Sequence, residues 1–139
     1  MKVTDGGGLS DTATYTITVT NLDEPPVVMQ GQSFSVNENS GASAGSLGTV
    51  EVSDEDSTAA QLTFSLVASS AANNFRISSA GAITLAPSFS PDFEQTAQYS
   101  FEVKVTDQSG LTDTETVSVL VIDQNEQPSI SAQELAIAE

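Results

Sequence analysis

Carboxylate side chains are the groups in this sequence that could do chemistry, and they gather where the chain turns. Asp54 and Asp56 flank Glu55 in the stretch VSDEDST, and Asp92 and Glu94 lie two residues apart in PDFE. Two carboxylates ~4 Å apart repel each other by about 4 kcal/mol at an effective dielectric constant near 20. Close clusters of this kind need a cation, whereas the same residues scattered over a surface would simply be solvated.

The composition restricts the candidate chemistry to hard cations with oxygen ligands. The 139 residues include 19 Asp and Glu against 3 Lys and Arg, a net charge of −16, and they contain no Cys or His. This charge excludes partners that are themselves anionic, so we expect no nucleic acid. The usual zinc ligands and the commonest general base are missing, which leaves Ca²⁺ or Mg²⁺. No apolar run approaches the ~20 residues of a membrane span, so we expect no direct membrane insertion in this segment.

The elements that must position the carboxylates are repeated along the chain. The segment KVTDGGGLSDTATYTITV begins at Lys2 and is similar to KVTDQSGLTDTETVSVLV, which begins at Lys104, 102 residues later. The linkers NLDEPP and DQNEQP follow, and FSVNE at 34–38 is similar to LAIAE at 135–139. We therefore expect an excerpt of a longer tandem array. Its parts are the end of one repeat with its linker at 1–25, a complete repeat at 26–125, and a linker with the first strand of a third repeat at 126–139.

Alternation of apolar residues with a period of two predicts β-strands throughout the complete repeat. The pattern is clearest at residues 99–105 and 117–121, and segments rich in Gly, Ser and Asp separate the strands. No segment has apolar residues at helical spacing. With a strand ending at Glu38 included, seven strands occupy about 100 residues. This is typical of an all-β, seven-stranded, Greek-key immunoglobulin-like β-sandwich with the alternating apolar residues as its core.

The acidic motifs, taken in order, resemble those of a cadherin repeat over the whole chain. The stretches VNEN, VSDEDS, PDFE, KVTDQSG and VIDQNEQP stand where that family has a strand-end glutamate, a D-x-D pair, a D-R-E triplet, a V-x-A-x-D-x-G aspartate and a D-x-N-D-N-x-P linker. In the family these motifs bind Ca²⁺ between successive domains. Five motifs in family order are a far more specific signal than any one of them.

The resemblance implies Ca²⁺ ligands at two junctions. The upper junction would use Asp23, Glu24, Asp54, Asp56 and Asp107, together with backbone oxygens of Pro25 and Ala60. The lower junction would use Glu38, Asp92, Glu94, Asp123, Glu126 and the backbone oxygen of Gln124, with Asn125 binding the next ion. The first linker departs from the family pattern by carrying Asn21 in the aspartate position and Asp23 in the asparagine position, and the second carries Glu126 in place of an aspartate.

The function implied by the resemblance is that of a calcium-binding, extracellular cadherin-like repeat in a tandem-repeat surface or secreted protein. Bound Ca²⁺ would make the array rigid for cell adhesion, and the N-E-x-P linker is similar to those of bacterial adhesins. The partners are then calcium ions and neighbouring repeats of the same chain, with a homophilic or a carbohydrate contact left open.

Two other classes of function compete with this interpretation. A carbohydrate-binding module of an extracellular bacterial protein is one, although its usual exposed aromatic platform conflicts with Phe and Tyr residues that fall mostly on core positions. A hydrolase with Asp92 and Glu94 as paired carboxylates is the other. Residues two apart on an extended loop can point apart and no second catalytic motif is present, so we expect no enzyme.

Overall fold

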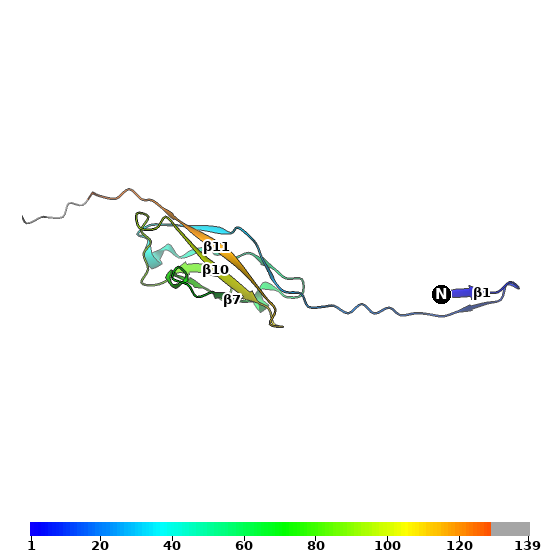
Figure 1. The fold of residues 1–139 in the computed structure, drawn as a ribbon. Helices are drawn as coiled ribbons and strands as arrows, with labels where there is room; N and C mark the ends of the chain where they lie inside the picture. The colour runs from blue at the N-terminus through cyan, green and yellow to red at the C-terminus, as the bar shows by residue number, and fades with distance from the viewer. Residues whose placement is uncertain (129–139) are drawn as a thin grey trace, which may run out of the picture.

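A four-stranded sheet forms one layer of a β-sandwich in the computed structural model, which describes residues 1–128 (Figure 1). Its strand order is β4 (Ser33–Asn37), β11 (Thr112–Ile122), β10 (Gln98–Thr106) and β7 (Thr63–Leu66). β10 is antiparallel to both of its neighbours, and β4 runs parallel to the second half of β11.

The second layer consists of β5 (Ser46–Thr49), β9 (Ala82–Leu85) and β8 (Phe75–Ile77), with β3 (Val27–Val28) paired to β6 (Val52–Ser53). β3 and β4 are two parts of the first strand, which changes sheets, and β5 and β6 are two parts of the second. Counted in this way the sandwich has the seven strands that the sequence predicts, and the all-β, immunoglobulin-like class is confirmed.

Short 3-10 turns lie between the strands, at η1 (Gly41–Ala44), η2 (Ala59–Gln61) and η3 (Ala72–Asn74). Among residues 1–128, no helix has the length and apolar character needed to cross a membrane.

The alternating apolar residues form the core between the two sheets, as predicted. Val103, Val105 and Val117 have no exposed surface, and the Phe75 ring packs against Phe101 with the ring centroids 4.7 Å apart. Full burial of each such side chain contributes about 1.5 to 3 kcal/mol. The buried apolar cluster comprises Val28, Val36, Val50, Leu62, Ala72, Phe75, Ile83, Leu85, Phe101, Val103, Val105, Val117, Val119 and Val121.

A glycine lets the first and second strands approach closely at one point in this core. The register of β5 against β9 shifts between Ser46 and Gly48, and Gly48 has a φ of +156°. A Cβ at Gly48 would lie 2.5 Å from Cδ1 of Phe34. The ring of Phe34 therefore occupies space that only glycine leaves free.

A hairpin of β1 (Lys2–Thr4) and β2 (Ser10–Thr12) lies apart from the sandwich (Figure 1). Residues 13–25, which connect this hairpin to the sandwich, have no regular secondary structure. The hairpin pairs Lys2 with Thr12 and Thr4 with Ser10 match the β10–β11 pairs Lys104 with Thr114 and Thr106 with Thr112 after the offset of 102 residues. The sequence repeat is thus a repeat of backbone pairing as well.

The surroundings of the two copies differ. Tyr15, Ile17 and Val19 are 70%, 87% and 89% exposed, whereas the equivalent Val117, Val119 and Val121 are buried in the core. The strand expected at 135–139, the start of a third repeat, lies outside the described residues.

Candidate metal sites

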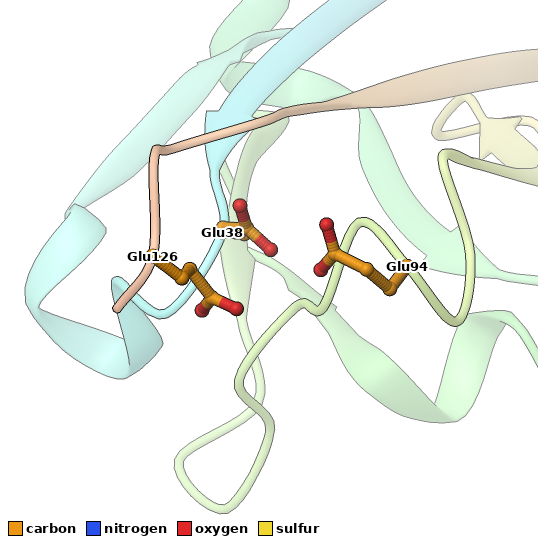
Figure 2. A group of neighbouring side chains, drawn as sticks. All are labelled: Glu38, Glu94 and Glu126. Atoms are coloured by element: carbon orange, nitrogen blue, oxygen red, sulfur yellow. The ribbon is translucent and has the colours of Figure 1, made fainter. Parts of the chain in front are cut away.

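Three glutamates converge at the end of the sandwich where β11 leads into the second linker. Glu38 follows β4, Glu94 lies in the loop before β10, and Glu126 lies in the linker. One carboxylate oxygen from each lies within 4.8 Å of the others, and Figure 2 shows the three side chains pointing toward a common space. Ca²⁺ binds oxygens at ~2.3 to 2.6 Å, so ligands around one ion can be spaced in this way. We call Glu38, Glu94 and Glu126 the lower cluster.

Glu38 is the buried member of the lower cluster, with 3% of its surface exposed. Its Oε1 accepts the backbone N–H of Gln124 at 2.6 Å, and its Oε2 accepts the backbone N–H of Phe93 at 2.9 Å. These hydrogen bonds, first that of Gln124 and then that of Phe93, lower the pKa of Glu38. The carboxylate therefore stays charged and joins the sandwich to the linker.

The pKa of Glu94 is shifted in the opposite direction to that of Glu38. Its own backbone amide lowers the pKa of the Glu94 carboxyl, but partial desolvation and the charges of Glu38 and Glu126 outweigh that contribution and raise the pKa overall. Mutual repulsion of this kind disappears when a cation binds between the carboxylates. The electrostatics of the lower cluster therefore favour occupation by a cation.

Asn39 contacts the lower cluster, and the sequence did not single it out. Its φ of 59° lies in the left-handed region, its backbone N–H donates to the carbonyl oxygen of Pro91 at 2.8 Å, and its side-chain amide donates to the carboxylate of Glu126. Asparagine is one of the few residues that adopts this conformation readily. Its sequence signal is the second asparagine of VNEN, which directly follows Glu38.

The other residues predicted at the lower junction lie outside the lower cluster. Both carboxylate oxygens of Asp92 bind Gln95, Oδ1 its backbone N–H at 2.9 Å and Oδ2 its side-chain amide at 2.7 Å. Asp123 and Asn125 are exposed, and the carbonyl oxygen of Asp123 accepts the Gln124 side-chain amide at 2.9 Å. The metal-binding roles of Asp92, Asp123, Gln124 and Asn125 remain predictions, as do those of Glu38, Glu94 and Glu126.

Asp56 holds the first linker at the opposite end of the sandwich. Its Oδ1 accepts the side-chain amide of Asn21, and its Oδ2 accepts the backbone N–H of Glu24 at 3.1 Å. The hydrogen bond from Glu24 and then that from Asn21 lower the pKa of Asp56. The pKa of Glu24 is raised, mainly by its contact with the Asp56 side chain and then by desolvation. The negative charges of Asp56, Glu55 and Asp23 raise it further. Asn21, Glu24 and Asp56 thus form one hydrogen-bonded network, and Asp23 acts on it through its charge.

Two buried carboxylate oxygens at this end have no hydrogen-bond partner among the described residues. They are Oδ2 of Asp54 and Oδ2 of Asp107, which follow β6 and β10 respectively. Asp107 is only 6% exposed, and its Oδ1 accepts the backbone N–H of Leu111 at 2.8 Å. A buried anionic oxygen without a donor is costly, and a bound cation removes that cost. Asp54 also lines an open hollow of about 530 Å³ with Glu24, Ser53 and Glu55.

The aromatic side chains between residues 26 and 128 lie in the core or against it, away from the exposed positions that a sugar-binding platform requires. Within residues 26–128, Phe75 and Phe101 are buried in the core. The other aromatic residues of that range pack against the core, namely Phe34, Phe64, Phe89, Phe93 and Tyr99. The placement of these residues agrees with the core role that the sequence predicts.

Comparisons with known proteins agree with the fold. The family model described as Bacterial Ig domain matches residues 23–120. A search of curated protein sequences finds no match.

Among solved structures, the chain is similar to cadherin extracellular domains. The EC3-6 cis-dimer structure of protocadherin gammaB7 matches with a TM-score of 0.66 and 23% identity, covering 85% of this chain and 30% of that one. The protocadherin gammaB4 extracellular domain matches with a TM-score of 0.63 and 29% identity, covering 76% and 17%. Human protocadherin-24 EC1-2 matches with a TM-score of 0.62 and 18% identity, covering 73% and 45%. This chain thus spans less than half the length of each.

The family match covers more than half of the chain, and the strand pairing, core and structural neighbours all agree with it. The chain belongs to the bacterial Ig domain family and is a cadherin-like, immunoglobulin-like repeat.

Proposed function

We propose that this chain is a calcium-binding extracellular repeat whose bound ions make a tandem array rigid for cell adhesion. The observation that supports this most directly is the pair of buried, unpartnered oxygens, Oδ2 of Asp54 and Oδ2 of Asp107. A hydrogen-bond donor or a cation has to complete such oxygens. Among divalent cations, Ca²⁺ suits flexible sets of carboxylate ligands, whereas Mg²⁺ demands near-ideal octahedral geometry.

In this proposal the carboxylates of each junction divide into two groups. Glu38 and Asp56 accept backbone amides of the linkers and so hold each linker against the sandwich. The remaining carboxylates, including Glu94 and Glu126 at one end and Asp54 and Asp107 at the other, supply oxygens for the ion. Bound Ca²⁺ would supply the positive charge that lets these groups stay ionised side by side. Joining groups from the sandwich and the linker restricts the direction in which the next repeat leaves.

The proposed location is outside the cell, on a bacterial surface or in a secreted protein. Extracellular calcium-binding modules typically have dissociation constants of about 10⁻⁴ to 10⁻³ M, which suits the calcium concentration outside cells. The cadherin structures to which the chain is similar are extracellular domains. We also propose that the repeat has a mechanical role and catalyses no reaction.

Calorimetric titration with CaCl₂ tests this function. We expect heat from binding in the millimolar range for the parent chain and a much smaller signal with MgCl₂. The double variant Asp54→Asn and Asp107→Asn should lose binding at the upper junction while its far-ultraviolet circular dichroism stays that of a β-protein. Equal titrations of the parent and the double variant would contradict the assignment of these two residues.

A further inference from the structure

The outward face of the four-stranded sheet is lined mainly by hydroxyl groups. Residues of the opposite phase, such as Val103 and Val119, point into the core, so their neighbours along each strand point outward. We call this surface the outer face. Its residues are Ser33, Ser35, Asn37, Thr63, Ser65, Gln98, Ser100, Glu102, Lys104, Thr106, Thr112, Thr114, Thr116, Ser118, Leu120 and Ile122.

Two charged residues, Glu102 and Lys104, stand near the middle of the outer face. They are two residues apart on β10, are both exposed, and pair across the sheet with Thr116 and Thr114. The outer face therefore has no net charge, in a chain whose net charge is −16. The clustered carboxylates described above lie at the two ends of the sandwich instead. A second copy of this chain would be repelled at those ends but not at the outer face.

We propose that two copies of this chain associate through their outer faces, with Lys104 of each copy opposite Glu102 of the other. A two-fold axis lying between the sheets, perpendicular to β10 and level with Val103, reverses the strand direction. It therefore sets residue 102 of one copy over residue 104 of the other and forms two reciprocal ion pairs. The same operation sets Thr114 opposite Thr116, so that hydroxyl groups meet hydroxyl groups. The two molecules then run in opposite directions.

The charge pattern favours a two-fold contact at this sheet over one at the opposite sheet. In the other sheet the outward residue of β8 is Arg76, which pairs across the sheet with Thr84, and Thr84 in turn pairs with Ser46. No carboxylate stands in that row, so a two-fold contact there would lack complementary charges. On the outer face the complementary charges are both present, at the spacing that a two-fold axis requires.

The expected contact is weak for a single repeat. Strands ~4.8 Å apart that rise ~3.3 Å per residue give the four strands a planar area of roughly 450 Å² per copy. Two such faces bury about 900 Å², the range of weak and transient interfaces. In a tandem array the same contact can form at several repeats at once, and multivalency then raises the overall affinity without any new contact.

The proposal goes beyond calcium binding and uses residues outside both junctions. Sedimentation equilibrium of the chain, up to about 1 mM, measures the self-association in calcium and in EDTA. We expect a monomer–dimer equilibrium that Lys104→Glu and Glu102→Lys each weaken by about tenfold or more, because each variant places like charges opposite each other. A mixture of the two single variants should associate as well as the parent does, because glutamates then face lysines.

Arg76→Glu is the matched control, because it changes the net charge by the same amount as Lys104→Glu on the opposite sheet. It should leave the dimer intact apart from a general effect of charge. The proposal would be overturned if the parent chain stayed monomeric at 1 mM. It would also be overturned if Arg76→Glu weakened self-association as much as Lys104→Glu, or if the mixture of single variants associated no more tightly than each variant alone. Retention of a monomeric chain on immobilised polysaccharide, lost in Lys104→Glu, would show that the face binds sugar instead. Calcium titration of the same variants should match the parent, so failure of this contact and failure of the calcium function are distinguishable.

Discussion

Oε1 of Glu38 accepts the backbone amide of Gln124 at 2.6 Å, joining the end of β4 to a linker residue 86 positions later. Asp56 has the same relationship to the backbone amide of Glu24 at the other end. A charged acceptor makes these hydrogen bonds stronger than neutral ones. Each linker is therefore partly oriented by the protein itself, and an ion at either junction would bind to an arrangement that is already half formed.

Replacing Glu38 with Gln tests this joining role. The two carboxylate oxygens of Glu38 accept two backbone N–H groups, whereas glutamine has only one side-chain oxygen. Its NH₂ group must face the other N–H, and two donors repel each other. We expect the Gln124 amide to exchange its proton about tenfold faster in Glu38→Gln, measured by NMR in EDTA, because a charge-assisted hydrogen bond is lost. Calcium affinity at the lower junction should fall as well.

Glu94→Gln is the control for that experiment. It removes one charge from the same cluster but no acceptor of a linker amide. Calcium affinity should fall while exchange at Gln124 stays that of the parent. If both variants changed the exchange of Gln124 equally, the hydrogen bond from Glu38 would not be what orients the linker.

Asp107→Asn should lower the melting temperature when calcium is present but not in EDTA. The variant keeps an oxygen that can accept from Leu111 but removes the charge associated with the unpartnered Oδ2. In EDTA we expect an equal or higher melting temperature, because a buried, unsatisfied anionic oxygen is gone. With calcium at a hundredfold excess over the dissociation constant, one lost site removes about 2.7 kcal/mol of stabilisation.

Asp5→Asn is the matched control for Asp107→Asn. Oδ1 of Asp5 accepts the Leu9 amide at 2.9 Å, as Oδ1 of Asp107 accepts that of Leu111. Asp5 is exposed, however, and lies in the separate hairpin. Its replacement should leave both melting curves unchanged. A calcium-dependent shift of the same size in the two variants would remove Asp107 from the site.

Acidification should weaken calcium binding before it unfolds the repeat. The pKa values of Glu24 and Glu94 are raised above the usual 4.5, so these groups take up protons first as the pH falls toward that value, and Ca²⁺ must then displace the protons. In EDTA this first step relieves repulsion and costs no stability. The pKa values of Glu38 and Asp56 are lowered from 4.5 and 3.8. Their stabilisation is present above those values and is lost as the pH falls through the lower, folded-state pKa values.

Calorimetry at pH 7, 6 and 5, in buffers with different ionisation enthalpies, measures the protons released when calcium binds. Thermal unfolding in EDTA from pH 7 to pH 3 measures the second step. We expect proton release to increase as the pH approaches 5, while the EDTA melting temperature holds or rises slightly until the pH passes below about 4.5. Unfolding in EDTA at a pH where calcium affinity is still unchanged would reverse this order and contradict the assigned pKa directions.

The sequence was sufficient to predict the paired strands β10 and β11, but not the division of the first strand into β3 and β4. Residues 99–105 alternate strictly, and a half-buried strand requires such a period, so β10 and its core residues follow directly. The hairpin at residues 2–12 has the register of β10 and β11, in agreement with the sequence repeat that relates the two segments. The change of sheet between β3 and β4 depends on pairing with β6 and β11, which are far away in the sequence. Local pattern contains no information about such partners.

The candidate site could be predicted by residue type but not by individual hydrogen bonds. Motif order places Glu38, Glu94 and Glu126 at one junction, and the structure brings these three together. Asp92 belongs to the same short motif as Glu94, yet the turn that follows directs its carboxylate to Gln95. Asn39 was not identified because its role depends on a left-handed backbone conformation. Turn geometry, which spacing alone does not define, decides which oxygens remain free for an ion.

The contact between Gly48 and Phe34 gives a prediction about the scaffold alone. In Gly48→Ala the new Cβ would lie 2.5 Å from the Phe34 ring, so the ring or the backbone must move. We expect a loss of about 3 kcal/mol in the free energy of unfolding, measured with urea, from overpacking together with the unfavourable backbone conformation. Gly31→Ala is the control, because Gly31 has a φ of +71° with no atom within 4 Å of an added Cβ. It should lose only about 1 kcal/mol.

Adding Phe34→Leu to Gly48→Ala should cost less than the two single losses combined, because the smaller side chain relieves the overlap. Equal losses in the two alanine variants, or additive losses in the double variant, would mean that Gly48 is needed for its backbone conformation and not for space beside Phe34.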